Sequence, residues 1–185
     1  MTPFEKALKH TLGIEGDYSD HPADSGGRTR YGITEAKARA FGYTGPMTAL
    51  PIELAKQIYK EDFWDIIRLD QVAELSEEVA LEMFDTSVNC GPGVPVKFLQ
   101  RLLNAFNRQQ TDYADIAVDG AMGRNTLAAL RAFLTRRGKL GAQVLVEALN
   151  SLQGAFYTDL AERRPKDEAF MFGWFASRVL KRAQP

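Results

Sequence analysis

The 185-residue chain has a single cysteine, Cys90, and two histidines, His10 and His21. One cysteine excludes an intramolecular disulfide and a thiolate metal cluster. Two histidines are too few for a multi-histidine zinc site, and His21 with its neighbouring aspartates forms only a weak ligand set. We therefore expect no metal and no cofactor. Cys90 follows an apolar helix pattern, which favours a buried, inert thiol over a nucleophile.

Long hydrophobic runs are also missing. No stretch approaches the roughly 20 apolar residues of a transmembrane helix, so we expect no stable membrane insertion. The N-terminal sequence MTPFEKALKHTLGIEG carries charges at Glu5, Lys6 and Lys9 in place of the apolar core of a signal peptide. The single cysteine predicts folding in a reducing cytoplasm. The N-terminal pattern predicts that something else must carry the protein out if it acts outside the cytoplasm.

Two common motifs are absent, namely the GxxxxGK phosphate loop and the GxSxG nucleophile elbow. The net charge is only −1, but it is unevenly spread. Residues 1–130 hold 13 Lys/Arg and 19 Asp/Glu, whereas residues 131–185 hold 10 and 5, a net of +5. Such a basic end suits an anionic cell-wall polymer, nucleic acid or phospholipid surface, or simply solvated helix faces. A faint helix-turn-helix likeness at 118–134 has little support from the overall charge, so we expect no nucleic acid partner.

Helical patterns dominate what is present. Thr2 to Glu5 form a capping-box signature, Thr34 and Ser76 are expected N-caps, and Gly138 is an expected helix end. The segment 28–34, RTRYGIT, predicts a short strand of a hairpin. Residues 107–120 are the longest irregular connection and a candidate hinge. Further helices are predicted over 50–69, 76–91, 96–107, 124–138, 142–164 and 168–183.

The stretch GIEGDYSDHPADSGGRTRYGIT, residues 13–34, crowds acidic and turn-forming residues after the first helix. Glu15 follows that helix end, where unpaired carbonyl groups carry partial negative charge and Ile14 and Tyr18 are apolar neighbours. Both influences raise the pKa of a carboxyl group, as a general acid requires. The competing interpretation is a glutamate that extends into solvent.

Asp24 follows nine residues after Glu15, and Asp17 and Asp20 lie nearer. A hairpin that returns past the helix end would place one of these aspartates across a cleft from Glu15. Two carboxylates in different environments are the minimal equipment of a glycosidase. Aspartates are also common in turns because of their local hydrogen bonds, so each one has a structural alternative.

Four motifs in order resemble glycoside hydrolase family 108, the phage-type N-acetylmuramidases. IEGDYSDHPADSGGRTRYGIT resembles that family's Glu-Gly-Gly-Tyr, Asp-x-x-Gly-Gly-x-Thr and Tyr-Gly-Ile-Thr start. MFDTSVNCGPGVPVKFLQRLLN resembles its Asp-x-x-Val-Asn-x-Gly-Pro segment. VDGAMGRNTLAALRAF and GWFASRVLK resemble the peptidoglycan-binding region that usually follows. The resemblance covers nearly the whole chain.

The resemblance implies a mainly α, lysozyme-like fold with about seven helices and one small β-hairpin near the active site. Residues 1–93 would form the muramidase catalytic region, and residues 94–185 a peptidoglycan-binding-like helical region. Because 93 residues make a marginal domain, we expect the two regions to share one core. Phe172, Trp174 and Phe175 are expected to be largely buried in it.

The resemblance also implies a reaction, hydrolysis of the β-1,4 bond between N-acetylmuramic acid and N-acetylglucosamine. The family's catalytic glutamate falls on Glu15. Glu15 and Asp24 match the first spacing of the related Glu-x8-Asp-x5-Thr pattern, whereas Thr29 comes one residue too early. Asp17 replaces the second glycine of Glu-Gly-Gly-Tyr, so that it either raises the pKa of Glu15 further or points away.

Three more residues are expected to line the substrate cleft, namely Tyr18, Tyr31 and Asn89, because aromatic faces and amides suit sugars. For Tyr31 and Asn89 the alternative is a buried, hydrogen-bonded structural residue. The competing functions are a lytic transglycosylase, a chitinase-like enzyme, and a catalytically silent wall-binding or export-accessory protein.

The expected partners are peptidoglycan glycan strands and a holin-type membrane permeabiliser, and the expected oligomeric state is a monomer. The resemblance to phage-type enzymes implies synthesis in the host bacterial cytoplasm without a signal peptide, followed by release to the cell wall.

Overall fold

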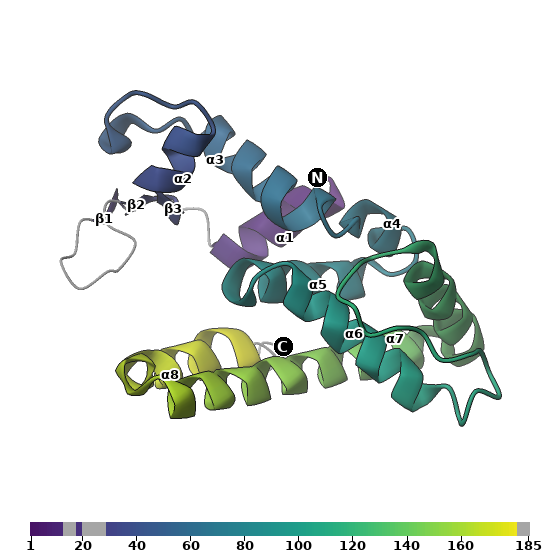
Figure 1. Ribbon diagram of the computed structural model, residues 1–185. Coiled ribbons are helices and arrows are strands. Elements are labelled where there is room, and N and C mark those ends of the chain that lie inside the picture. The colour runs from purple at the N-terminus through teal and green to yellow at the C-terminus, as the bar shows by residue number, and fades with distance from the viewer. Residues whose placement is uncertain (13–17, 20–28, 181–185) are drawn as a thin grey trace.

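The computed structural model describes residues 1–12, 18–19 and 29–180, and these residues are mainly helical, as expected (Figure 1). The α-helices are α1 Pro3–Leu12, α2 Glu35–Ala40, α3 Ile52–Tyr59, α4 Leu69–Ala73, α5 Glu77–Cys90, α6 Gly93–Phe106, α7 Arg124–Arg163 and α8 Glu168–Trp174. The strands are β1 Tyr18–Ser19, β2 Thr29–Arg30 and β3 Ile33–Thr34. Short 3-10 helices span Met47–Ala49 and Pro165–Asp167, and π-helical segments span Lys60–Asp65 and Phe175–Val179.

The predicted helix caps are confirmed. The backbone amide of Thr2 donates to Glu5 Oε2 over 2.7 Å, and the amide of Glu5 donates to Thr2 Oγ1 over 3.2 Å, which completes the capping box. The side chains of Thr34 and Ser76 each accept a hydrogen bond from the amide three residues later. Local side-chain chemistry therefore fixes where α1, α2 and α5 begin.

Gly138 interrupts α7. Its φ of 59° and ψ of −152° are not helical, so the predicted end at this glycine is confirmed and a second helical segment continues to Arg163. The helix expected over 50–69 differs from the prediction. It is α-helical to Tyr59 and then π-helical over Lys60–Asp65, and Arg68 has a φ of 52° just before α4.

The three strands form one antiparallel sheet in the order β1-β2-β3. Tyr18 pairs with Arg30 across the first ladder, and Thr29 pairs with Thr34 across the second. The expected small β-hairpin is therefore confirmed, but residues 29–34 contain two strands, β2 and β3, where the sequence predicts one, and β1 adds a third strand.

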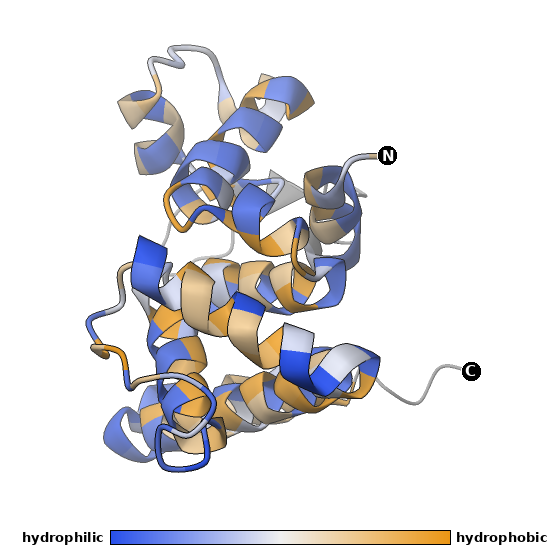
Figure 2. Cartoon of the chain, turned by 90° about the vertical axis from the view of Figure 1, so that its right-hand side faces the viewer, coloured by the Kyte–Doolittle hydropathy of each residue, from blue (hydrophilic) through white to orange (hydrophobic). Residues whose placement is uncertain are grey.

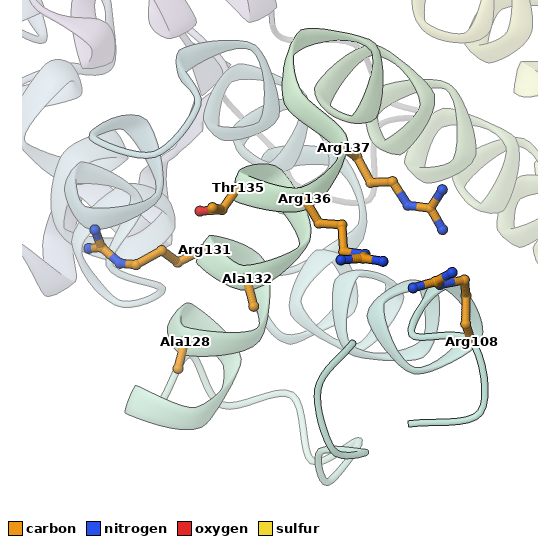
Figure 3. Close-up of a pocket in the computed structure, with 7 residues that line it drawn as sticks. All are labelled: Arg108, Ala128, Arg131, Ala132, Thr135, Arg136 and Arg137. Atoms are coloured by element: carbon orange, nitrogen blue, oxygen red, sulfur yellow. The ribbon is translucent and has the colours of Figure 1, made fainter. Parts of the chain in front are cut away.

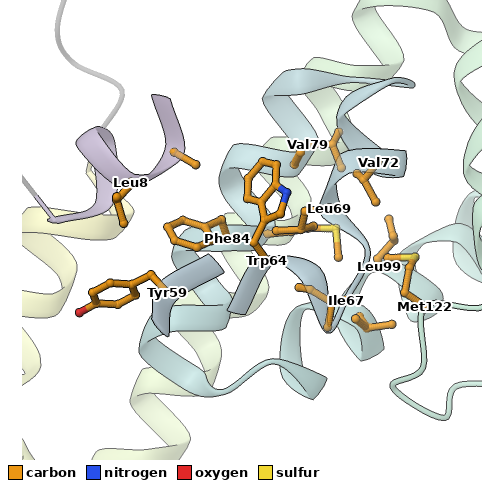
Figure 4. Close-up of a cluster of buried hydrophobic side chains, with 14 of the residues drawn as sticks. Leu8, Tyr59, Trp64, Ile67, Leu69, Val72, Val79, Phe84, Leu99 and Met122 are labelled. Carbon is orange, nitrogen blue, oxygen red and sulfur yellow. The ribbon is translucent and has the colours of Figure 1, made fainter. Parts of the chain in front are cut away.

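Helix α5 is at the centre of the helical packing, where α1, α4, α6 and α7 all contact it. The largest buried side chains include Trp64 and Phe84, whose rings meet edge to face at 5.7 Å. The same hydrophobic cluster includes Leu99 from α6 (Figure 4). It also includes Leu130 from α7. Figure 2 shows the apolar residues of the helices turned toward one another. Residues on both sides of position 93 thus contribute to one core.

The expected burial of Phe172 is wrong, whereas that of Trp174 and Phe175 holds in part. Phe172 is 86% exposed, the other two are half-buried, and α8 has no buried residue. The reason is that α8 packs mainly against α7, which covers one side of the helix. Trp174 packs on Tyr157 with ring centroids 5.1 Å apart. Phe172 lies two positions earlier, on the opposite side of the helix.

The loop between α6 and α7 is bonded to α6 by side-chain amides. Asn104 donates to the carbonyl of Ile116 over 2.8 Å and accepts from its amide over 2.9 Å. Gln100 accepts from the amide of Gly120 over 2.9 Å. These bonds hold the loop against the helix, so the hinge interpretation of residues 107–120 has no support. Within the described residues, no helix is long and apolar enough to cross a membrane.

Candidate active site

The predicted catalytic pair belongs to the connections on either side of β1. Glu15 lies between α1 and β1 in the sequence, and Asp24 lies between β1 and β2. Both residues, together with Asp17, fall outside the described residues, so their roles stay predictions. The structure does place the elements that flank them. Helices α1 and α5 both end on the side of the molecule where the sheet lies (Figure 1).

Thr29 begins β2 and stands opposite Ser19 in β1 and Thr34 in β3. Its side chain is half-buried. Because β2 is the middle strand, the strands on both sides hold the backbone of Thr29 in place. Tyr18 belongs to β1 and pairs with Arg30, but its side chain is outside the described part of the chain.

Tyr31 and Gly32 form the turn between β2 and β3. Their φ values of 54° and 73° are both positive, the combination that a tight hairpin turn of the type I′ class requires. The hydroxyl of Tyr59 donates to the carbonyl of Tyr31 over 3.0 Å, and burial raises the pKa of Tyr59 to about 12, so it remains a donor at neutral pH. A Cβ on Gly32 would lie 2.5 Å from the Tyr59 hydroxyl. Helix α3 thus holds the hairpin in place.

The side chain of Tyr31 is half-buried, and the guanidinium of Arg30 lies 5.0 Å from its ring centroid. Tyr31 therefore has features of both predicted roles. Its carbonyl group is bonded within the structure, and part of its side chain is accessible to a ligand. Asn89 is exposed near the end of α5, where its Nδ2 donates to the carbonyl of Asp85 over 2.6 Å. The buried structural alternative for Asn89 is therefore wrong.

Sequence reasoning missed a buried ionic junction at Asp85 on α5. Arg178 Nη1 donates to Asp85 Oδ1 over 2.7 Å, and Gln153 Nε2 donates to Asp85 Oδ2 over 3.1 Å. Gln153 also donates to the hydroxyl of Tyr157 over 3.0 Å. The available signal was an aspartate within the otherwise apolar MFDTSV segment, but its partner Arg178 lies 93 positions away. The junction joins α5 to α7 and to the end of the described chain.

Cys90 lies beside this junction. Burial raises the pKa of its thiol to about 12, so the thiol stays protonated at neutral pH. This agrees with the inert thiol expected from the sequence. Among the described residues, no group of three or more His, Cys, Asp or Glu side chains is arranged to hold a metal ion.

Comparison with known proteins assigns both parts of the chain. Residues 8–91 match the family model described as Glycosyl hydrolase 108, and residues 94–179 match the model described as Predicted Peptidoglycan domain. The comparison with curated proteins found no match. Among solved structures, Brucella abortus SagA is 30% identical with a TM-score of 0.70, over 95% of this chain and 88% of that one. The chain therefore belongs to glycosyl hydrolase family 108, and it is a glycoside hydrolase that carries a peptidoglycan domain.

Proposed function

We propose that the protein is an endolysin-type N-acetylmuramidase. It hydrolyses the β-1,4 bond between N-acetylmuramic acid and N-acetylglucosamine, with Glu15 as the general acid. The observation that carries the proposal is the family match over residues 8–91, a stretch that includes Glu15, Asp24 and Thr29. The peptidoglycan domain over residues 94–179 supports peptidoglycan as the substrate.

The helix that precedes Glu15 supports the choice of acid. Helix α1 ends at Leu12, and Glu15 follows three residues later. The last carbonyl groups of a helix carry partial negative charge, which disfavours an ionised carboxylate close to them. A glutamate that keeps its proton can donate it to the oxygen of a glycosidic bond. Asp24 and Thr29 follow on the far side of β1.

The proposed reaction begins when Glu15 protonates the glycosidic oxygen as the bond to the anomeric carbon breaks. Positive charge develops on the sugar ring, and the carboxylate of Asp24 stabilises it or holds the attacking water. The hydroxyl group of that water adds to the anomeric carbon, and its remaining proton returns to a carboxylate. Thr29 helps to position the water from the middle strand of the sheet. Tyr18, Tyr31 and Asn89 contact the glycan.

Product analysis on purified peptidoglycan tests the reaction. A muramidase leaves a reducing N-acetylmuramic acid end, whereas a lytic transglycosylase leaves a 1,6-anhydro end. Cleavage of chitin oligomers in preference to peptidoglycan would indicate a chitinase-like enzyme. Intact glycan strands that stay bound to the protein would identify a silent wall-binding protein. Each of the last three results would overturn the proposal.

The variant Glu15→Gln should lose about 10²–10⁴-fold in activity, because the amide keeps the shape of the side chain but has no transferable proton. Its melting temperature should stay close to that of the wild type. Glu74→Gln, at an exposed glutamate, is the matched control and should be as active as the wild type. Asp24→Asn should cost less than Glu15→Gln, and Thr29→Ala less again. A Glu15→Gln protein with more than about a tenth of wild-type activity would contradict the assignment.

A further inference from the structure

A basic groove of about 940 Å³ lies along the first half of α7 and the residues that follow α6. Its wall includes four arginines, Arg108, Arg131, Arg136 and Arg137, and the side chains between them are small (Figure 3). We refer to it as the arginine groove. It lies at the opposite end of the molecule from the β-sheet (Figure 1), so it is separate from the candidate active site.

One carboxylate partly balances these four cations. Arg108 Nε donates to Asp112 Oδ2 over 2.9 Å, and Arg136 Nε lies 2.7 Å from Asp112 Oδ1. Asp112 thereby fixes the positions of two guanidinium groups that remain 47% and 56% exposed. No ion pair within the described part of the chain engages Arg131 or Arg137, and both are exposed. The groove therefore keeps a surplus of positive charge.

The arrangement of the charges indicates the shape of the ligand. In Figure 3, Arg108 and Arg136 extend toward each other with Arg137 beside them, whereas Arg131 points to the other side of the helix. Small side chains, including Ala128 and Ala132, separate the two sides. A compact anion would contact one side only. An extended ligand with several carboxylates would reach both, and guanidinium groups suit carboxylates because they donate two parallel hydrogen bonds.

We propose that the arginine groove binds the carboxylates of the peptide stems of peptidoglycan. This inference rests on the proposed function for its choice of polymer, because peptide stems are the part of peptidoglycan that carries several carboxylates on a flexible chain. The groove holds the polymer at a distance from the site of cleavage. It thereby gives the second half of the chain a contact with peptides, while the candidate active site contacts sugars.

The test measures binding of the full chain to purified sacculi, before and after amidation of their carboxylates. The double variant Arg131→Glu and Arg137→Glu reverses two charges of the groove and leaves the hydrogen bonds of Asp112 in place. The control Arg101→Glu and Arg164→Glu makes the same charge change at two exposed positions outside the groove. Melting temperatures confirm that the variants are folded, and the amidation arm requires no variant at all.

The groove variant should bind native sacculi about tenfold more weakly than the wild type, and the control should bind like the wild type. Amidation should weaken the wild type by a similar factor and leave the groove variant unchanged. Wild-type binding by the groove variant would overturn the proposal. So would wild-type binding that survives amidation, or stronger competition by duplex DNA than by free stem peptides. Binding does not depend on cleavage, so a protein that binds through these arginines without hydrolysing glycan would refute the proposed function alone.

Discussion

Two aspartates, Asp85 and Asp112, both pair with arginine, and they lie in contrasting surroundings. The side chain of Asp85 is 3% exposed, and that of its partner Arg178 is 21% exposed. The side chain of Asp112 is 4% exposed, but its two partners, Arg108 and Arg136, are about half exposed. In the first cluster Arg178 pairs with Asp85 inside the protein, and in the second Arg108 and Arg136 both pair with Asp112 at the surface.

The difference follows from the cost of removing charge from water. A buried ion is tolerated only when an opposite charge and further hydrogen bonds compensate for lost hydration, and Arg178 and Gln153 supply both for Asp85. At the surface, water and salt screen the repulsion between like charges, so a surplus of arginines persists. The buried cluster therefore joins α5 to α7 and to the end of the described chain, while the exposed cluster is left with charge that a ligand can use.

Removing the second half of the chain should have the largest effect. A truncation after Gly93 deletes Arg178 and Gln153, which bond Asp85, and the core residues Leu99 and Leu130. We expect a protein that is insoluble or unfolded, without a cooperative transition in circular dichroism melting. A sharp transition, together with hydrolysis of soluble fragments, would instead show that residues 1–93 form an independent module.

Substituting Arg178 should rank next. Arg178→Met removes the charge-assisted hydrogen bond to the buried carboxylate of Asp85 and should lower the free energy of unfolding by about 3 kcal/mol in urea denaturation. Adding Asp85→Asn should restore part of that loss, because the buried side chain at position 85 is then uncharged. The exposed counterpart Arg136→Met should cost much less. If Arg136→Met proved as costly as Arg178→Met, the contrast between the two clusters would fail.

The hairpin turn at Gly32 contains no ion pair, so its variants give losses of stability with which those of the two charged clusters can be compared. Gly32→Ala should destabilise the protein by more than about 1 kcal/mol, because the new Cβ meets the Tyr59 hydroxyl at a positive φ. Tyr59→Phe should cost about 1 kcal/mol, since it removes only the hydrogen bond to the Tyr31 carbonyl. Thermal unfolding of both variants checks the order. A Gly32→Ala protein as stable as the wild type would contradict this account of the turn.

The smallest effect is expected at Asp112. Hydrogen bonding from Arg108 holds the pKa of Asp112 below its usual range. Its contribution to stability is therefore present above the unfolded pKa of about 4 and is lost as pH falls through the lowered folded value. The melting temperature of Asp112→Asn should be slightly below that of the wild type at pH 7, and the two should converge in more acidic solution. A difference that stays constant as Asp112 becomes protonated would exclude this ion-pair explanation.

Some residues of the candidate site can be predicted from the sequence, and others cannot. The motif order indicated the family and singled out Glu15 and Asp24, whose roles the experiments above must decide. Thr29, Tyr31 and Asn89 were proposed from their motifs, and the structure places all three at or near the sheet and the end of α5. Asp85 was not proposed, although it lies four residues before Asn89, because its significance depends on a partner 93 positions away.

The sequence by itself determined the local features, such as the capping box at Thr2 and Glu5, the N-caps at Thr34 and Ser76 and the helix break at Gly138. Each depends on a side chain or a φ preference acting within a few residues. Only the tertiary structure decided which apolar faces are covered and which charges are paired. It left Phe172 exposed because α7 covers only one side of α8, and it gathered the arginines of two separate segments around Asp112. These outcomes depend on contacts between distant segments, which periodicity in one stretch does not encode.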